Sequence, residues 1–175
     1  MLPILKEMEQ MLDALDNDKV EEYLDKLLPM LSQSNVDIIG LAAGRMGYAL
    51  RAFIMRLNHM GFNASMIGDT NVPRVRKNTI LFINSSSGET PSILLYTKQA
   101  AKESGKIFLT SCNNNSSIAN YAESIIQIPE INSIQLMKSP YEQFTMLLYD
   151  YIIIRLVDSL GLDKDKISKN HSILE

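Results

Sequence analysis

One segment of the chain reads Ile80-Leu81-Phe82-Ile83-Asn84-Ser85-Ser86-Ser87-Gly88-Glu89-Thr90-Pro91. Its apolar first part predicts a buried strand, and the polar part predicts a loop that opens into a helix at Pro91. Such a loop suits an anion, because the N-terminus of a helix presents unpaired N–H groups and the positive end of the helix dipole. Hydroxyl groups for this anion are supplied by Ser85, Ser87 and Thr90. The alternative is an ordinary strand-to-helix loop in which Thr90 only caps the helix.

Strands and helices alternate along most of the chain. The expected strands are 36–41, 63–67, 79–84, 106–110 and 124–128, and the expected helices that follow the first strand are 48–60, 91–104, 116–122, 139–160 and 163–170. Before them, residues 2–31 have helical spacing that is broken at Asp16-Asn17-Asp18, with Asp18 as the expected cap of a second helix. This alternation predicts an α/β fold with a doubly wound, five-stranded and mainly parallel sheet flanked by helices.

Composition excludes several classes of protein. A chain of 175 residues with 46% apolar residues is expected to form one domain, 1–175, with a proper core. A net charge of −3 provides no basic field for nucleic acid, and the single cysteine, Cys112, excludes an intrachain disulfide or a cysteine-built zinc site. The N-terminus carries charges where a signal peptide needs apolar residues, and no apolar run is long enough to span a membrane. We expect a cytoplasmic protein that binds neither nucleic acid nor membrane.

Three loops lie at the predicted ligand-binding edge of the sheet, because ligands of parallel sheets bind at the carboxyl ends of the strands. They are residues 42–47, 85–90 and 110–117. The first loop lacks the glycine pattern of a dinucleotide site, and the chain contains no Gly-Lys-Ser/Thr, which excludes a P-loop. The loops therefore favour a small anionic ligand over a nucleotide.

Four segments resemble a known family. Gly44-Arg45-Met46-Gly47 with residues 52–61 resembles the opening of a sugar isomerase (SIS) domain, and Ser85 to Thr90 resembles its Ser-Gly-Ser-Gly-Glu-Thr phosphate loop. Residues 133–143 are similar to the Gln-Pro-Met-Gly-Ser-Leu-Phe-Glu-Gln segment of 6-phospho-3-hexuloisomerases, and residues 171–175 to their closing His-Ala-Asn-Leu-Glu. These segments occur in the expected order over nearly the whole chain.

The resemblance implies a SIS-type, flavodoxin-like three-layer sandwich. It implies an isomerase that interconverts a 3-ketohexose 6-phosphate and fructose 6-phosphate through a cis-enediol, without metal or cofactor. The partners that it implies are a phosphorylated sugar and further copies of the chain, as a homodimer or homotetramer. We expect the N-terminal helices (1–33) and the C-terminal helices (139–170) to pack on the core or at subunit interfaces.

The resemblance also implies roles for individual residues. Glu142 would be the base, His171 would move protons between the substrate oxygens, and His59 is the reserve candidate for that role. Arg45 would hold the phosphate or polarise a hydroxyl group. The phosphate would be anchored by Ser85, Ser87 and Thr90. Each role has a structural alternative. Glu142 suits the first turn of a helix, His59 suits the last turn, and His171 lies in a polar tail. Arg45 could simply pair with an acidic neighbour.

The chain departs from the family pattern at Met46, Ser86, Lys138 and Ile173, which stand where a serine, two glycines and an asparagine are usual. These departures leave an isomerase or epimerase of another sugar phosphate as an alternative. A non-catalytic phosphosugar sensor is the alternative from another class. The retention of Glu142 and a histidine in the tail, without a basic DNA-binding segment, favours the enzyme.

Overall fold

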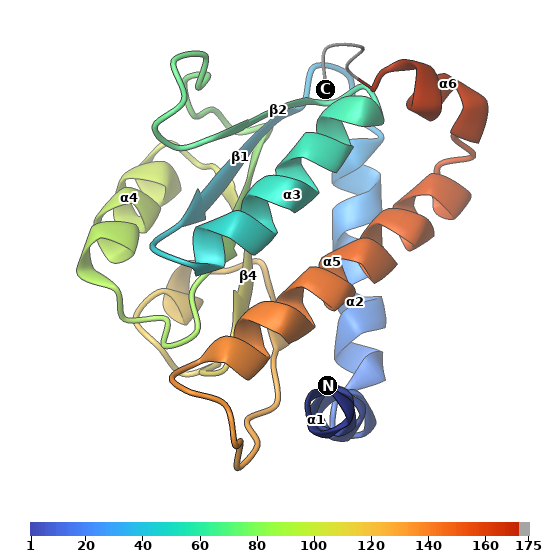
Figure 1. Cartoon of the computed structure of the whole chain (residues 1–175). Helices are drawn as coiled ribbons and strands as arrows, with labels where there is room; N and C mark the ends of the chain where they lie inside the picture. Colours follow the sequence, from blue (N-terminus) through green and yellow to red (C-terminus); the bar gives the residue numbers. More distant parts are fainter. Residues whose placement is uncertain (172–175) are drawn as a thin grey trace.

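Five parallel strands form the centre of the computed structural model, which describes residues 1–171 (Figure 1). The strands are β1 (Asp37–Ala42), β2 (Asn63–Met66), β3 (Thr79–Asn84), β4 (Lys106–Ser111) and β5 (Ser124–Gln127). They lie in the order β2-β1-β3-β4-β5, and every pair is parallel. The predicted α/β fold is confirmed, and each strand lies within two residues of its expected bounds.

The central strand shows why the sequence folds in this way. β3 pairs with β1 on one side and β4 on the other, and all six of its residues are buried. Such a strand is covered on both faces of the sheet, so a continuous apolar run is what it requires.

Residues 1–171 form six α-helices around this sheet (Figure 1). They are α1 (Leu2–Asp13), α2 (Asn17–Leu31), α3 (Met46–His59), α4 (Pro91–Lys102), α5 (Ser139–Ser159) and α6 (Lys164–Lys169). Residues of α2, α3 and α5 share one core with one face of the sheet, where Phe53 lies between Phe82 and Tyr149. The other face packs against α4 and a short 3₁₀ helix, η1 (Ala119–Tyr121). No helix within residues 1–171 is both long and apolar enough to cross a membrane.

Two local expectations are wrong. The cap of α2 is Asp16, whose side chain accepts a hydrogen bond from the Lys19 backbone at 3.1 Å, whereas Asp18 already lies in the first turn. The helix expected at 116–122 is reduced to η1. The backbone N–H of Ser117 donates to the Glu89 carboxylate, and that of Ile118 to the Gly88 carbonyl, as the unpaired N–H groups of a first helical turn can. The helical turn ends because the backbone is extended at Ala122 and the Glu123 N–H donates to the Ile107 carbonyl of β4.

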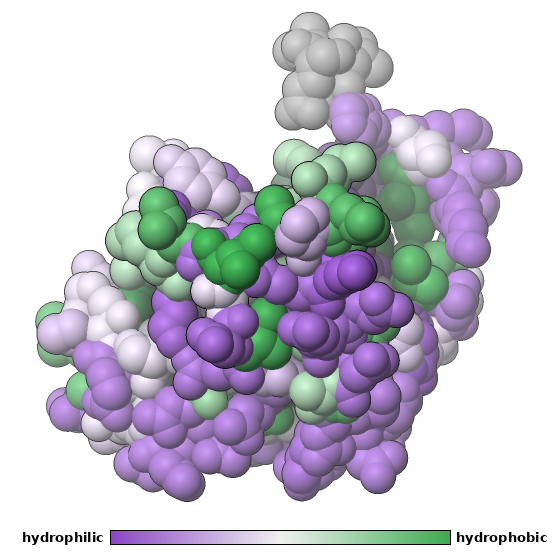
Figure 2. Space-filling view, turned by 60° about the horizontal axis from the view of Figure 1, so that its bottom comes forward, coloured by the Kyte–Doolittle hydropathy of each residue, from purple (hydrophilic) through white to green (hydrophobic). Residues whose placement is uncertain are grey.

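The fold brings several loops to one edge. The carboxyl ends of the parallel strands, the N-terminus of α3 and the N-terminus of α5 lie toward the bottom of Figure 1. Helix α3 returns to the opposite edge, where α6 also lies. Figure 2 turns the bottom of the molecule toward the viewer and shows a mainly hydrophilic surface with smaller hydrophobic areas.

Candidate functional site

The loop after β3, residues 85–90, is the segment that resembles the phosphate loop of SIS domains. Its backbone makes hydrogen bonds within the loop and to the loop after β4. Gly88 has φ +66° and its N–H donates to the Ser85 carbonyl at 3.1 Å. A Cβ atom on Gly88 would lie 2.0 Å from the Ser116 Oγ, so glycine is required by both conformation and space. The Ser86 carbonyl accepts bonds from the Cys112 N–H at 2.9 Å and the Ser111 hydroxyl at 3.1 Å. The loop is therefore organised before any ligand binds.

The three hydroxyl groups of this loop differ in their surroundings. Ser87 is exposed, Thr90 is half-buried, and Ser85 is buried with no hydrogen-bond partner for its Oγ atom among the described residues. Thr90 occupies the cap position of α4, but its side chain makes no capping bond. The interpretation of Thr90 as only a cap therefore finds no support in the structure. The exposed Ser87 hydroxyl and the N-terminus of α4 are available to an anion.

Glu89 of the phosphate loop has a structural role that the sequence did not reveal. Its carboxylate accepts a hydrogen bond from the Ser117 N–H at 2.7 Å, and this bond lowers the pKa of Glu89. The carboxylate thereby joins the phosphate loop to the loop after β4.

Glu142 and Arg45, far apart in the sequence, meet at the same edge of the sheet. The Arg45 Nη2 lies 2.7 Å from the Glu142 Oε1, and the side chains are 47% and 21% exposed. Arg45 immediately precedes α3, and Glu142 lies in the first turn of α5. The Glu142 Oε1 is buried and forms the ion pair without a hydrogen bond of good geometry. A carboxylate and a guanidinium placed in this way can move a proton and stabilise a developing oxyanion.

Both histidines of the chain lie at the other end of α3. His59 is in its last turn, the rings of His59 and His171 are 5.1 Å apart between centroids, and Asn170 donates to the His59 carbonyl at 2.7 Å. A helix of 14 residues is about 20 Å long, so a single chain does not bring either histidine to Glu142. The place of His59 suits the interaction with the helix dipole that was its alternative role. Ile173 lies outside the described residues.

The segment that leads into α5 is held by a buried carboxylate. Glu7 of α1 is 6% exposed and accepts bonds from the Ser133 hydroxyl at 3.0 Å, the Ile134 N–H at 2.8 Å and the Gln135 side chain at 2.7 Å. The hydrogen bond from Gln135 is the main cause that lowers the pKa of Glu7. Within the amphipathic pattern of α1, nothing local indicates that this one glutamate is buried.

Comparisons with known proteins identify the family of the chain. The family model of the SIS domain matches residues 30–152. The chain belongs to the SIS domain family. This SIS domain is 32% identical to a 3-hexulose-6-phosphate isomerase of Bacillus subtilis, over 98% of this chain and 95% of the relative. It is 31% identical to a protein of the same name from Methanocaldococcus jannaschii, over 89% and 86%.

A solved structure has the same architecture. This structure, of a Methanococcus jannaschii protein, has a TM-score of 0.84 and 26% identity to the SIS domain, covering 99% of this chain and 97% of that protein. A molecular function of 3-hexulose-6-phosphate isomerase has been inferred for that protein.

The departures from the family pattern have distinct structural consequences in this SIS domain. Met46 is partly buried and packs against the main core. The Ser86 hydroxyl lies 3.5 Å from the Cys112 sulfur, and Lys138 forms an ion pair with Glu130. The charge that Lys138 brings to this region is therefore balanced by a neighbouring carboxylate.

Proposed function

We propose that this SIS domain isomerises a 3-ketohexose 6-phosphate to fructose 6-phosphate. The observation that carries the proposal is the ion pair of Arg45 and Glu142 at the same sheet edge as the phosphate loop. Support for the substrate comes from the relatives named 3-hexulose-6-phosphate isomerase.

The chemistry follows from the arrangement of these groups. The phosphate binds to the Ser87 and Thr90 hydroxyls and to the N-terminus of α4. The Glu142 carboxylate removes the proton from C2 of the 3-ketose, which gives a 2,3-enediol, and returns a proton to C3. The proton of the C2 hydroxyl moves to the oxygen on C3, and the carbonyl group forms at C2. Arg45 stabilises the negative charge that develops on these oxygens.

We propose that His171 reaches this site from a neighbouring chain. Its role as the proton shuttle is a prediction from the resemblance, and within one chain it lies beside His59, at the end of α3 away from Glu142. A second copy that places its own α6 against this edge would supply the missing acid and base.

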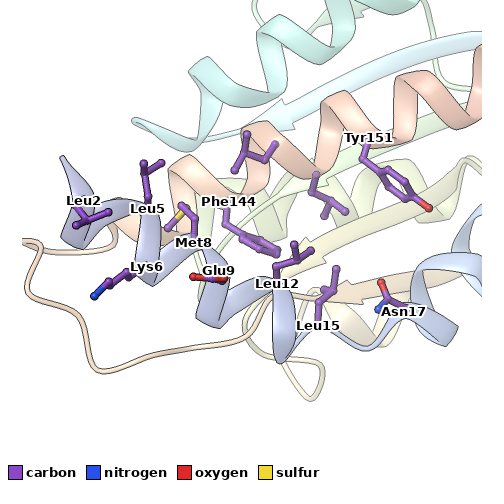
Figure 3. A pocket seen from close by; sticks show the side chains of 12 residues that line it. Leu2, Leu5, Lys6, Met8, Glu9, Leu12, Leu15, Asn17, Phe144 and Tyr151 are labelled. Atoms are coloured by element: carbon purple, nitrogen blue, oxygen red, sulfur yellow. The ribbon is translucent and has the colours of Figure 1, made fainter.

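An apolar groove between α1 and α5 is the surface that we assign to such a second copy (Figure 3). The groove has a volume of about 680 Å³, and six of the side chains that line it are Leu5, Leu12, Leu15, Phe144, Leu147 and Tyr151. Leu12 and Leu147 are more than half exposed, at 58% and 55%. Lys6 and Glu9 also line the groove, so two copies related by a two-fold axis can pair these opposite charges while covering the apolar surface. We propose a homodimer or homotetramer built on this groove.

A panel of ketose and aldose phosphates tests the activity. We expect turnover of the 3-ketohexose 6-phosphate, followed by NMR, with deuterium entering the substrate carbon from deuterated water. Turnover of a different sugar phosphate would establish the alternative isomerase or epimerase. Binding of a phosphosugar without any turnover would support the sensor and contradict the enzyme.

Mixed oligomers test the origin of His171. Glu142→Gln and His171→Ala chains are each expected to be inactive, and a refolded mixture is expected to recover about a quarter of the wild-type activity. In a dimer, half of the molecules would be mixed, and one of the two sites in each would carry both native residues. No recovery in a mixture that forms mixed oligomers would contradict a shared site. A monodisperse monomer in light scattering at micromolar concentration would contradict the assembly.

A further inference from the structure

A buried tyrosine joins the start of α5 to the ends of two strands. The Tyr141 hydroxyl lies 2.5 Å from the Asn84 Oδ1 and 2.9 Å from the Thr110 carbonyl oxygen. Tyr141 is 2% exposed and Asn84 is fully buried. Burial raises the pKa of Tyr141, so its hydroxyl keeps its proton and remains a donor. The first turn of α5 is therefore fastened to β3 and β4 by a polar contact inside the core.

The same asparagine contacts the first residue of α3. The Asn84 Nδ2 donates to the Met46 carbonyl at 3.2 Å. Because a carbonyl only accepts hydrogen bonds, this contact directs the amide nitrogen to Met46 and leaves the amide oxygen for Tyr141. The orientation of the Asn84 amide is therefore set by both partners, and either partner alone would leave a buried polar atom unpaired.

These contacts and the ion pair together form a closed ring of residues. Tyr141 directly precedes Glu142, and Met46 directly follows Arg45. The ring thus runs from Glu142 to Tyr141, through Asn84 to Met46, and back through Arg45 to the Glu142 carboxylate. The contact between Tyr141 and Asn84 is buried, and a hydrogen bond in the interior is stronger than in water, whereas the contact between Asn84 and Met46 is partly buried.

We propose that Asn84 and Tyr141 are positioning residues, which hold the Glu142 carboxylate and the Arg45 guanidinium at the separation that catalysis uses. The proposal rests on the proposed function, because it assigns these residues through the role of Glu142. Neither residue needs to contact the substrate. A misplacement of about 1 Å in a reacting group can lower the rate about a hundredfold, so the hydroxyl of one buried side chain is expected to matter.

Tyr141→Phe tests the proposal, since it removes one oxygen and keeps the ring that packs in the core. We expect kcat to fall about ten- to a hundredfold while KM changes less than about twofold, because the phosphate loop is not altered. Tyr149→Phe is the matched control. Tyr149 is a buried tyrosine of the same helix, and no hydrogen bond within the described chain ties its hydroxyl to Asn84 or Met46. The control is expected to retain kcat within about twofold.

A double-mutant cycle separates positioning from general destabilisation. Asn84→Ala is expected to lower kcat to a similar extent, and Asn84→Ala with Tyr141→Phe to lower it no further than the worse single variant, because both act through one contact. Multiplied losses in the double variant, or kcat within twofold of wild type in a folded single variant, would overturn the proposal. If Tyr141→Phe does not fold, the kcat of Asn84→Ala alone tests the proposal, because in that variant the Tyr141 hydroxyl keeps its hydrogen bond to the Thr110 carbonyl. A wild-type chain without turnover of any phosphosugar would contradict the proposed function itself, and the positioning role with it.

Discussion

Replacement of Glu142 by glutamine separates chemistry from architecture at the candidate site. Glu142→Gln keeps the size of the side chain but removes its ability to accept a proton at neutral pH. We expect kcat to fall by about 100- to 10,000-fold, which is the usual contribution of a general base. Binding of the phosphosugar should survive, because in the proposed function the phosphate binds to residues 85–90 and the N-terminus of α4 and not to Glu142.

The structure limits how much stability this substitution can cost. The ion pair with Arg45 is partly exposed, with side chains 47% and 21% accessible, so it contributes about 0–1 kcal/mol. The loss of a charge from the first turn of α5 costs about 0.3–1 kcal/mol more. A total of about 0.3–2 kcal/mol corresponds to a fall of roughly 1–8 °C in Tm for a domain of this size. Unfolding at the assay temperature therefore cannot account for a loss of activity of the expected size.

The assay follows isomerisation and proton exchange together, with thermal unfolding measured on the same samples. The wild type should introduce deuterium into the substrate carbon, and Glu142→Gln should not. Glu130→Gln is the matched control, because it also neutralises a carboxylate in an ion pair, the one with Lys138 near the start of α5, and should keep its activity. A fully active Glu142→Gln enzyme would remove Glu142 from the mechanism, and a variant that does not fold would show that its role is structural.

Ser87→Ala should raise KM about ten- to a hundredfold with little change in kcat, since a hydrogen bond to a charged group contributes about 1.5–3 kcal/mol. An equal rise in KM for a substrate without phosphate would refute the role of Ser87 in binding the phosphate. Gly88→Ala should lower Tm by at least about 2–8 °C in a thermal melt, because its φ of +66° costs about 1–2 kcal/mol before the contact with Ser116 is counted. Glu7→Gln should make the free energy of unfolding fall less steeply in acid. The hydrogen bond from Gln135 lowers the pKa of Glu7 below 4.5. The stability that the ionised Glu7 contributes is therefore present above pH 4.5 and is lost as the pH falls through the lowered pKa. Urea midpoints at several pH values measure this, and identical acid slopes in both proteins would refute it.

Local patterns in the sequence determined most of the fold of this SIS domain. The strand at 79–84 and the turn at Gly88 were predictable, because burial on both sheet faces demands a continuous apolar run and a tight loop demands glycine. The loop of residues 85–90 at the N-terminus of a helix was also predictable, since the ends of helices and their hydroxyl-bearing neighbours are local features, and its role in anion binding stays a prediction. Glu142 and Arg45 were identified from the resemblance as separate residues, without any sign that they meet.

Tertiary structure decided what depends on contacts between distant segments. Only the folded chain joins Arg45 to Glu142, buries Asn84 against Tyr141 and buries Glu7 under the segment before α5. The helix expected at 116–122 is shorter than expected for a similar reason, because the backbone becomes extended at Ala122 and the Glu123 N–H bonds to Ile107 of β4. Periodicity and capping describe interactions between near neighbours in the sequence. The choice of partner for a buried polar group depends on which distant groups the fold leaves within about 3 Å of it, and no local pattern carries that information.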